Sequence, residues 1–458
     1  MNAIILSALS GVLLMFSGIL TTNRTVVRNL AIALCALVLV ANCAEMAGHR
    51  LFTVNTRGML HFAAFGLLFN SIALVVTLLY FLLSARDINA VGVNGPDYFA
   101  LIFFILAGVA IVSSYNNMLM LFLGIEIISI PLYVLTGSDK RNLKSNEAGL
   151  KYLLMGAFST GIMLMGITLI YGAKASFSLD GLGPMINPGR NAWFIAGLLL
   201  LLASMAFKVS AAPFHFWTPD VYDGAPTVFT SFMATIVKAA LFIAFVRLFD
   251  TAFADNRSSW RLVLSVITAA TLFIGNITAI FQQSVKRMLA YSSIAQAGFM
   301  LFALYAYNDL SKEGLILYTL AYSLATVGIF AVLARLKDYT FEGFNGLART
   351  EPVLAATTAI FLLSLAGIPM TLGFFSKYYM LAAAVKEGGN LWLVFFAVLC
   401  AVVSVYYYFR VIQAMYFRSG EPAMEPVNSG FRWVLVLMAA ALVILGVFPN
   451  LVLQYLYF

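Results

Sequence analysis

The stretch that decides the fold is residues 207–242, which read FKVSAAPFHFWTPDVYDGAPTVFTSFMATIVKAALF. Apolar runs long enough to cross a membrane lie on both sides of it, yet Lys208 and Lys238 lie well inside those runs and Pro213 interrupts the first. Because proline has no N–H and its ring clashes with the carbonyl four residues earlier, the carbonyl of Val209 is expected to lose its helical partner. We therefore predict irregular backbone beside a charge, which a bilayer tolerates only where protein or a water-filled cavity receives the freed groups.

The overall composition predicts a membrane protein. Of the 458 residues, 62% are hydrophobic and only 10% are charged, and the mean hydropathy is +0.95. A hydrocarbon core of roughly 30 Å needs about 20 apolar residues per helix, and runs of this length follow one another almost from end to end. We expect an all-α, polytopic protein in the lipid bilayer, without a separately folded soluble domain.

Charged and ligand-type residues exclude several other classes. The net charge of +8 comes from basic residues scattered singly over short loops, which is typical of membrane orientation and not of the continuous basic stripe that binds nucleic acid. Cys35, Cys43 and Cys400 are isolated, and the three histidines are too scattered for a haem or metal site. We predict no nucleic-acid partner and no metal, cofactor or redox centre in this chain.

About fourteen membrane-spanning helices are expected from the apolar runs, with boundaries good to about 2 to 4 residues. The runs lie near residues 3–20, 28–46, 60–83, 97–112, 118–136, 148–172, 191–216, 227–249, 261–281, 288–307, 314–336, 352–384, 390–416 and 431–455. The short connections between them favour a compact bundle of antiparallel neighbours.

The basic residues of the loops predict the orientation. Twelve fall in connections after odd-numbered helices: Arg24, Arg28, Arg86, Lys140, Arg141, Lys144, Lys286, Arg287, Arg335, Lys337, Arg349 and Arg418. Eight fall after even-numbered helices: Arg50, Arg57, Lys174, Arg190, Arg257, Arg261, Lys312 and Lys386. Because cytoplasmic loops are enriched in lysine and arginine, the odd set is predicted to be cytoplasmic and both termini to lie outside.

Two of the predicted helices contain an interior proline with a lysine close by, namely Lys208 with Pro213 and Pro369 with Lys377. Pro369 is expected to free the carbonyl of Leu365. Corresponding broken helices in two halves of a chain indicate an inverted repeat. We predict three N-terminal helices in residues 1–95, a first repeat in 96–250, a second repeat in 256–417 and a C-terminal helix in 431–458.

Four ionisable residues lie deep in apolar runs: Glu126, Lys208, Lys238 and Lys377. Each costs ~3 kcal/mol on insertion scales, so together they oppose insertion by ~12 kcal/mol. The alternatives to function are static ion pairs and snorkelling to the interface. The short side chain of Glu126 does not suit snorkelling, and Lys238 lies about 11 residues from either end of its run. Intramembrane charges of this kind are typical of ion pathways.

Snorkelling suits three other basic residues better. Lys151 starts a predicted helix, and Lys286 and Arg287 lie at a cytoplasmic helix entrance, where long side chains can keep their charge in water. Tyr406, Tyr407 and Tyr408, with Arg410 near a helix end, look like an interfacial aromatic belt, and we assign them no chemistry.

The chemistry of the four deep residues suggests a proton relay. A poorly hydrated interior disfavours a charged lysine, and a neighbouring carboxylate favours it. Breaking a pair of Glu126 and Lys208 would therefore make Lys208 release a proton, which could move stepwise through Lys238 and Lys377 by way of bridging water.

Three residues after the first break suggest a proton entrance. His215, Asp220 and Asp223 follow Pro213 closely and could admit protons from the cytoplasmic side. The alternative is an ordinary polar loop with a turn at Asp223-Gly224.

Five blocks of sequence together resemble a known family. They are GIEIISIPLYVLTG (124–137), EAGLKYLLMGAFSTG (147–161), FKVSAAPFHFWTPDVYDGAPT (207–227), SVKRMLAYSSIAQAGFM (284–300) and LAGIPMTLGFFSKYYM (365–380). In order and spacing they resemble the antiporter-like subunits of bacterial proton-translocating NADH:quinone oxidoreductase, respiratory complex I, and among these subunit N. The first 95 and last 40 residues add only suitable hydrophobicity.

The resemblance implies a fold with two inverted five-helix repeats, each with a broken helix. It implies that Glu126 and Lys208 are the coupling pair, that Lys238 is the central relay and that Lys377 is the terminal proton site. It also implies a bacterial inner (plasma) membrane, M-type and K-type subunits as neighbours, and NADH, FMN, iron-sulfur clusters and quinone bound by other subunits.

Two other functions stay open. Subunits L and M and the multisubunit cation/proton antiporters usually have a histidine early in the helix after the broken one, where this chain reads TVFTSFMATIVKAA, so its absence favours subunit N. A subunit of a multisubunit cation/proton antiporter is one alternative. A structural membrane scaffold with locked ion pairs is the other.

Overall fold

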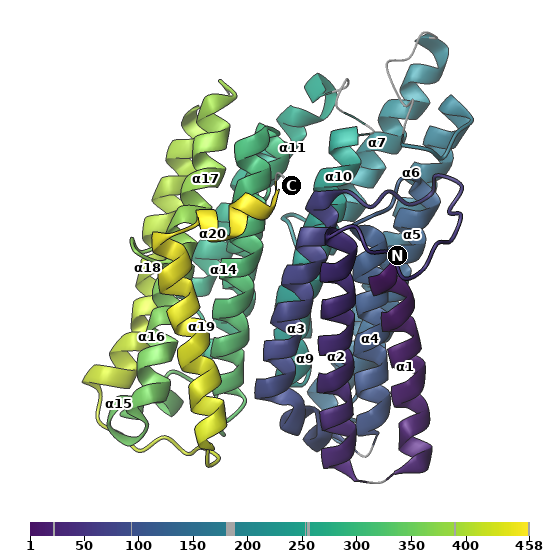
Figure 1. The fold of residues 1–458 in the computed structure, drawn as a ribbon. Coiled ribbons are helices and arrows are strands. Elements are labelled where there is room, and N and C mark those ends of the chain that lie inside the picture. Colours follow the sequence, from purple (N-terminus) through teal and green to yellow (C-terminus); the bar gives the residue numbers. More distant parts are fainter. Residues whose placement is uncertain are drawn as a thin grey trace.

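The computed structural model describes residues 1–21, 23–92, 94–179, 188–251, 253, 257–388 and 391–456. In these ranges the regular secondary structure is helical, and strand-like pairing is limited to isolated bridges such as Leu60 with Tyr115. Figure 1 shows the longer helices standing side by side in one bundle, with α1 to α4 and α16 to α19 at opposite sides and α14 between them.

The long helices, in chain order, have the following bounds. They are α1 Asn2–Leu20, α2 Arg24–Met46, α3 Ala64–Val91, α4 Gly95–Val112, α5 Met118–Thr136, α6 Leu143–Lys174, α7 Pro188–Lys208, α10 Lys238–Thr251, α11 Arg257–Ile280, α12 Val285–Met300, α14 Asp309–Leu333, α16 Pro352–Ala366, α17 Leu372–Lys386, α18 Leu391–Phe417 and α19 Ser429–Val447. Shorter ones are α8 Trp217–Gly224, α9 Thr227–Phe232, α13 Phe302–Ala306, α15 Leu347–Thr350, α20 Asn450–Leu453 and a π-helical turn at Met233–Val237.

Several helices start after an asparagine that caps the helix N-terminus. Asn117, Asn142, Asn308 and Asn428 each accept a backbone N–H of the helix that follows. Such caps satisfy N–H groups that have no partner inside the helix and contribute about 1 kcal/mol each. They set the boundaries of helices whose apolar composition alone does not define an end.

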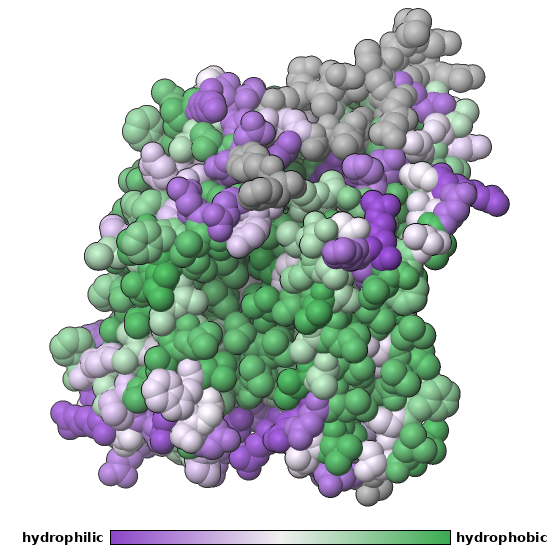
Figure 2. Space-filling model, viewed as in Figure 1, coloured by the Kyte–Doolittle hydropathy of each residue, from purple (hydrophilic) through white to green (hydrophobic). Residues whose placement is uncertain are grey.

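The helices have the dimensions of membrane spans. Twelve within the described residues are long and apolar enough to cross a bilayer, and they coincide with twelve of the predicted runs. The other two predicted runs are the ones interrupted near Pro213 and Pro369. Helix α7 ends at Lys208, within the run 191–216, and the run 352–384 is divided between α16 and α17. The predicted total of fourteen crossings stays a prediction. Figure 2 shows the corresponding surface, an apolar belt between two more hydrophilic ends.

The core lies around three central spans. Nearly all of Thr227–Phe249, Val285–Ala306 and Asp309–Leu333 is buried, whereas about a third of α1, α2, α18 and α19 is. Because the outer helices are apolar on their exposed faces as well, polar groups in the membrane interior gather on the central spans. The predicted proton-transfer residues are found along these spans and beside the two interrupted helices.

Candidate functional site

The first break occurs where the sequence predicted it. Helix α7 ends at Lys208, residues 209–216 are not helical, and α8 starts at Trp217. The backbone of Ser210 has a positive φ of 66°, a conformation that non-glycine residues adopt rarely and mostly at functional sites. The indole of Trp217 donates to the carbonyl of Phe207 at 3.1 Å, so the second half-helix is fastened to the end of the first.

Lys208 and Glu126 are close but not in tight contact. Their Nζ and Oε1 atoms are 3.9 Å apart, longer than the 2.7–2.9 Å of a charge-assisted hydrogen bond. Thr160 on α6 lies between them: its hydroxyl donates to Glu126 at 2.8 Å and accepts from Lys208 at 3.4 Å. Lys208 also donates to the hydroxyl of Ser129 at 3.1 Å. The pair is therefore linked through hydroxyl groups that permit it to open.

The two partners differ in exposure. The Lys208 side chain is 5% exposed, whereas that of Glu126 is 21% exposed. The lysine belongs to the interior of the bundle, and the carboxylate reaches toward the outer face of α5. A neighbouring chain or a shift of α5 can therefore act on Glu126 more directly than on Lys208.

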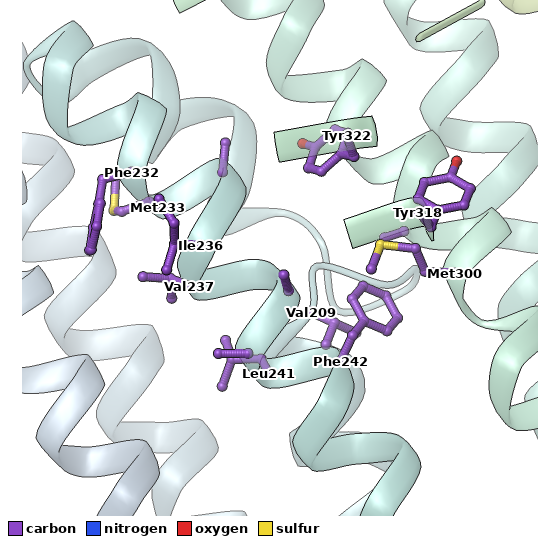
Figure 3. Packing of buried hydrophobic residues seen from close by; sticks show 14 of the residues in the cluster. Val209, Phe232, Met233, Ile236, Val237, Leu241, Phe242, Met300, Tyr318 and Tyr322 are labelled. Atoms are coloured by element: carbon purple, nitrogen blue, oxygen red, sulfur yellow. The ribbon is translucent and has the colours of Figure 1, made fainter. Parts of the chain in front are cut away.

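Lys238 lies on the central span and is held by the second half of the chain. Its ammonium donates to the carbonyl and hydroxyl of Ser293 on α12, at 3.1 and 3.0 Å, and lies over the ring of Tyr222. Among the described residues it forms no ion pair. The π-helical turn Met233–Val237 directly precedes it, and such turns are frequent at functional sites. Figure 3 labels Val237 and Leu241, which precede and follow Lys238 along the chain.

The second break lies before Lys377, which is in the half-helix that follows it. Helix α16 ends at Ala366 and α17 begins at Leu372. The ammonium of Lys377 donates to the carbonyls of Leu365 and Ala366 at 2.8 and 3.0 Å and lies over the ring of Phe299. The carbonyl that Pro369 was predicted to free is thus one of the two that bind the lysine.

Helix α12 connects the surroundings of Lys238 and Lys377. One turn after Ser293, the amide of Gln296 donates to the carbonyl of Leu365 and to the hydroxyl of Tyr408, both at 3.0 Å. The hydroxyl of Tyr318 on α14 donates to the same amide. A cavity of about 10 Å³ lies among Gln296, Tyr318 and Lys377, which is the room that a single water molecule needs. The two lysines are therefore joined by polar groups on one helix.

Sequence reasoning missed the hydroxyl and amide groups of this connection. Residues 285–306 have the lowest mean hydropathy of the twelve spans, 1.4 against 2.0 or more, because Ser292, Ser293 and Gln296 interrupt them. That low value was an available signal. The tyrosine prediction was wrong for two of the three: Tyr407 and Tyr408 are fully buried, and only Tyr406 is exposed.

Of the residues suggested for a proton entrance, Asp220 and Asp223 line one cavity, and His215 is not among the residues that line it. His215 is buried and stacks on Phe216, and its Nδ1 has no protein partner in the described part of the chain. Asp220 forms ion pairs with Lys151 and Arg287 at 2.9 and 3.0 Å. Asp223 lines a cavity at the end of the bundle, together with Lys286.

The snorkelling predictions had a mixed outcome. Lys151 and Arg287 are partly exposed, with 41% and 35% of their side chains accessible. The expectation was wrong for Lys286, which is buried and donates to the carbonyls of Asp223 and Ala225 at 2.8 and 2.7 Å. Those carbonyls lie at the C-terminal end of α8, where Ala225 is the cap residue, and a helix C-terminus attracts positive charge. The long side chain of Lys286 therefore reaches backbone carbonyls of the protein and not water.

Comparison with known proteins identifies the family. Residues 115–404, which include all four deep ionisable residues, match the family of transmembrane proteins described as NADH:quinone oxidoreductase/Mrp antiporter. The chain belongs to this family. Residues 1–114 and 405–458 lie outside the match.

Relatives of this antiporter-like chain match it almost from end to end. NADH-quinone oxidoreductase subunit N of Cytophaga hutchinsonii is 40% identical and aligned over 99% of both chains. A chain of respiratory complex I from Thermus thermophilus is 32% identical, with a TM-score of 0.85 and 99% of this chain and 98% of that one covered. A chain of the Mrp complex from a Dietzia species is 18% identical with a TM-score of 0.85, over 99% and 95%. That last likeness shows the antiporter-like fold alone.

Proposed function

We propose that the chain is the N-type, proton-translocating subunit in the membrane arm of a bacterial NADH:quinone oxidoreductase. Full-length relatives named subunit N support the assignment to that complex. The observation that supports translocation is that Lys208, Lys238 and Lys377 are all buried and that the ammonium group of each is held by neutral oxygen atoms.

The proposed cycle begins at Glu126. When the conformation of neighbouring subunits draws its carboxylate away, Lys208 loses the nearby negative charge and releases a proton into the interior. Lys238 receives a proton and passes it along the groups of α12 toward Lys377. Serine, threonine and tyrosine hydroxyls accept one proton as they donate another, and bridging water closes the remaining gaps. Lys377 then releases the proton on the opposite side.

The chain itself would perform no redox chemistry. NADH, FMN, iron-sulfur clusters and quinone would be bound by other subunits, and the signal would reach this chain mechanically. M-type and K-type subunits would be its neighbours, and the partly exposed Glu126 suits a place near one of these contacts. The predicted orientation, with both termini outside the bacterial inner membrane, belongs to the same proposal.

The predicted repeats fit this function. The interrupted helix is the fourth of five in residues 96–250, where α4, α5 and α6 precede it, and again in 256–417, where α11, α12 with α13, and α14 precede it. Each repeat would provide one half of a path across the membrane, with Lys238 between them.

Removing the central amine tests the proposal. The Lys238→Met complex is expected to assemble but to lose NADH-driven proton pumping in proteoliposomes, because the amine proposed to carry the proton between the two breaks is gone. Lys386→Met, which removes an exposed lysine from α17, is the matched control and should pump normally. Normal pumping by assembled Lys238→Met complex would contradict the proposal.

The second candidate, a subunit of a cation/proton antiporter, rests on the Mrp-like fold alone. It predicts sodium/proton exchange that proceeds without NADH and quinone. Pumping that stops when either NADH or quinone is omitted, in vesicles that show no sodium-driven proton movement, would exclude it.

A further inference from the structure

An acidic cavity of about 590 Å³ lies where α3, α8 and α14 end and α9 and α12 begin. Its titratable lining residues are Asp87, Asp139, Asp223, Asp338, Glu425, Tyr339, Lys144 and Lys286. Behind it, Arg335 pairs with Asp87 and Glu425. Five carboxylates against three basic groups leave a negative balance in a chain whose net charge is +8. Such a concave acidic surface raises the local concentration of protons.

Polar groups line the side of the cavity where α9 begins. The ammonium of Lys286 donates to the carbonyls of Asp223 and Ala225 at 2.8 and 2.7 Å, so its positive charge is fixed beside the end of α8. The hydroxyl of Thr227, the first residue of α9, donates to the hydroxyl of Tyr339 at 3.1 Å. These two hydroxyls lead from the cavity to the seam between α9 and α14, which pack against each other.

Three buried hydroxyls without protein partners follow along that seam. Ser231 lies one turn after Thr227 on α9, and Thr326 and Tyr322 lie one turn apart on α14. Each of the three is at most 3% exposed, and within the described ranges no protein group hydrogen-bonds their oxygen atoms. Residues four apart share one helix face, so Ser231 lies on the face of α9 that carries Thr227, and Tyr322 and Thr326 lie on one face of α14.

The partner of Lys238 lies on a neighbouring helix. Helix α14, which carries Tyr322 and Thr326, packs against α12, and on α12 Ser293 accepts a hydrogen bond from Lys238 at 3.0 Å. Figure 3 shows Tyr318 and Tyr322 one turn apart on α14, with their hydroxyls directed to different sides. Tyr318 bonds to Gln296 in the connection to Lys377, whereas the hydroxyl of Tyr322 has no protein partner within the described ranges.

A buried hydroxyl without a partner costs about 1–3 kcal/mol, and three along one seam are explained by water that the protein orders there. A chain of hydroxyls and ordered water conducts protons, because each oxygen accepts one proton and donates another. After one transfer each hydroxyl again carries one proton. One proton has been taken from the cavity, and one has arrived at the neutral amine of Lys238.

We propose that Ser231, Thr326 and Tyr322 line the path by which protons pass from the acidic cavity to Lys238. The inference rests on the proposed function and names the intake side of it. Of the residues suggested from sequence for the entrance, it retains Asp223, at the cavity, and assigns no step to His215 or Asp220.

The test uses the assembled complex in proteoliposomes to which NADH is added outside, so that only complexes with their cytoplasmic side outward turn over. In Thr326→Val, proton pumping is expected to fall several-fold, and the loss should deepen as the outside pH rises, because protons then reach Lys238 too slowly. Changing the inside pH should not alter the ratio to wild type. Thr326→Ser, which keeps the hydroxyl, should restore the rate, and Ser231→Ala should behave as Thr326→Val.

Thr358→Val is the matched control, because Thr358 is a buried threonine on α16 whose hydroxyl likewise has no partner among the described residues. It should keep the wild-type dependence on outside pH. Wild-type pumping in both Thr326→Val and Ser231→Ala, or a loss that is equal at every outside pH and is not restored by serine, would overturn the path. If Lys238→Met still abolishes pumping, only the path fails and the proposed function stands.

Discussion

The two interrupted helices hold their lysines in opposite ways. Lys208 is the last residue of the half-helix before its break, and its ammonium faces hydroxyls with Glu126 at 3.9 Å. Lys377 lies in the half-helix after its break, and its ammonium is held by the two carbonyls at the end of the half-helix before it. Both ammonium groups are stabilised by negative potential, in one case from a side chain and in the other from the backbone.

The difference suggests which site can be switched. A glutamate side chain can rotate or follow a neighbouring chain, and its full charge is then gained or lost at once. Carbonyls at a helix C-terminus present a partial charge that moves only with the helix. We therefore infer that the first site receives the signal and that the second responds to it.

The largest expected effect comes from removing either amine. Lys208→Met and Lys377→Met should each reduce proton pumping by about 100-fold or more, the usual consequence of losing a positioned proton-transfer group. Pumping and NADH:quinone activity would be measured per assembled complex, with assembly checked on native gels. If Lys208→Met impaired assembly and left the activity of the remaining complex unchanged, Lys208 would be part of a structural scaffold.

The next effect should separate the two sites. Glu126→Gln keeps a hydrogen-bond acceptor for Thr160 but removes the charge beside Lys208, so NADH:quinone turnover should fall by about tenfold or more, equivalent to at least 1.4 kcal/mol in the barrier. Glu147→Gln on α6, whose side chain is 63% exposed and pairs with Lys151 at the surface, is the control. Equal turnover in the two variants would show that the carboxylate of Glu126 does not act on Lys208.

A smaller effect is expected from the backbone of the second break. Gly367 has a φ of +82°, and a Cβ there would lie 2.9 Å from Cδ of Lys377. Gly367→Ala combines about 1–2 kcal/mol of left-handed strain with displacement of the lysine, and turnover should fall by about tenfold. Gly388 has a φ of +68° with open space where a Cβ would lie. Gly388→Ala therefore introduces the same backbone strain without displacing a side chain, and its turnover should be unchanged. A similar loss in both would attribute the effect to strain.

The smallest effect concerns the hydroxyl between Glu126 and Lys208. Thr160→Val removes one donor and one acceptor, about 1 kcal/mol, and should lower turnover by only about fivefold. Thr168→Val lies on the same helix, where the exposed hydroxyl bonds only to the carbonyl of Leu164, and should have no effect on NADH:quinone activity. A loss in Thr160→Val as large as that in Glu126→Gln would mean that the hydroxyl, and not the charge, couples the pair.

Much of the architecture could be predicted because its causes are local. Apolar runs of about 20 residues require membrane helices, and the described structure has a helix in each predicted run. Pro213 and Pro369 lie in the two interrupted segments, as expected from the backbone hydrogen bond that a proline cannot donate. The rule does not act alone, because Pro131 lies inside α5 without ending it. The expectation about the Leu365 carbonyl followed from the same local rule.

What the sequence determined by itself was therefore the kind of protein, the position of its two breaks and the presence of four charged residues within apolar runs. Only the tertiary structure decided which oxygens face each lysine: Ser293 lies 55 residues from Lys238, and Thr160 lies 48 residues from Lys208. The physical reason is that these helices are apolar on the faces toward lipid and toward one another. Polarity along the chain thus does not reveal which face turns inward, as Tyr407, Tyr408 and Lys286 show, and packing among distant helices makes that choice.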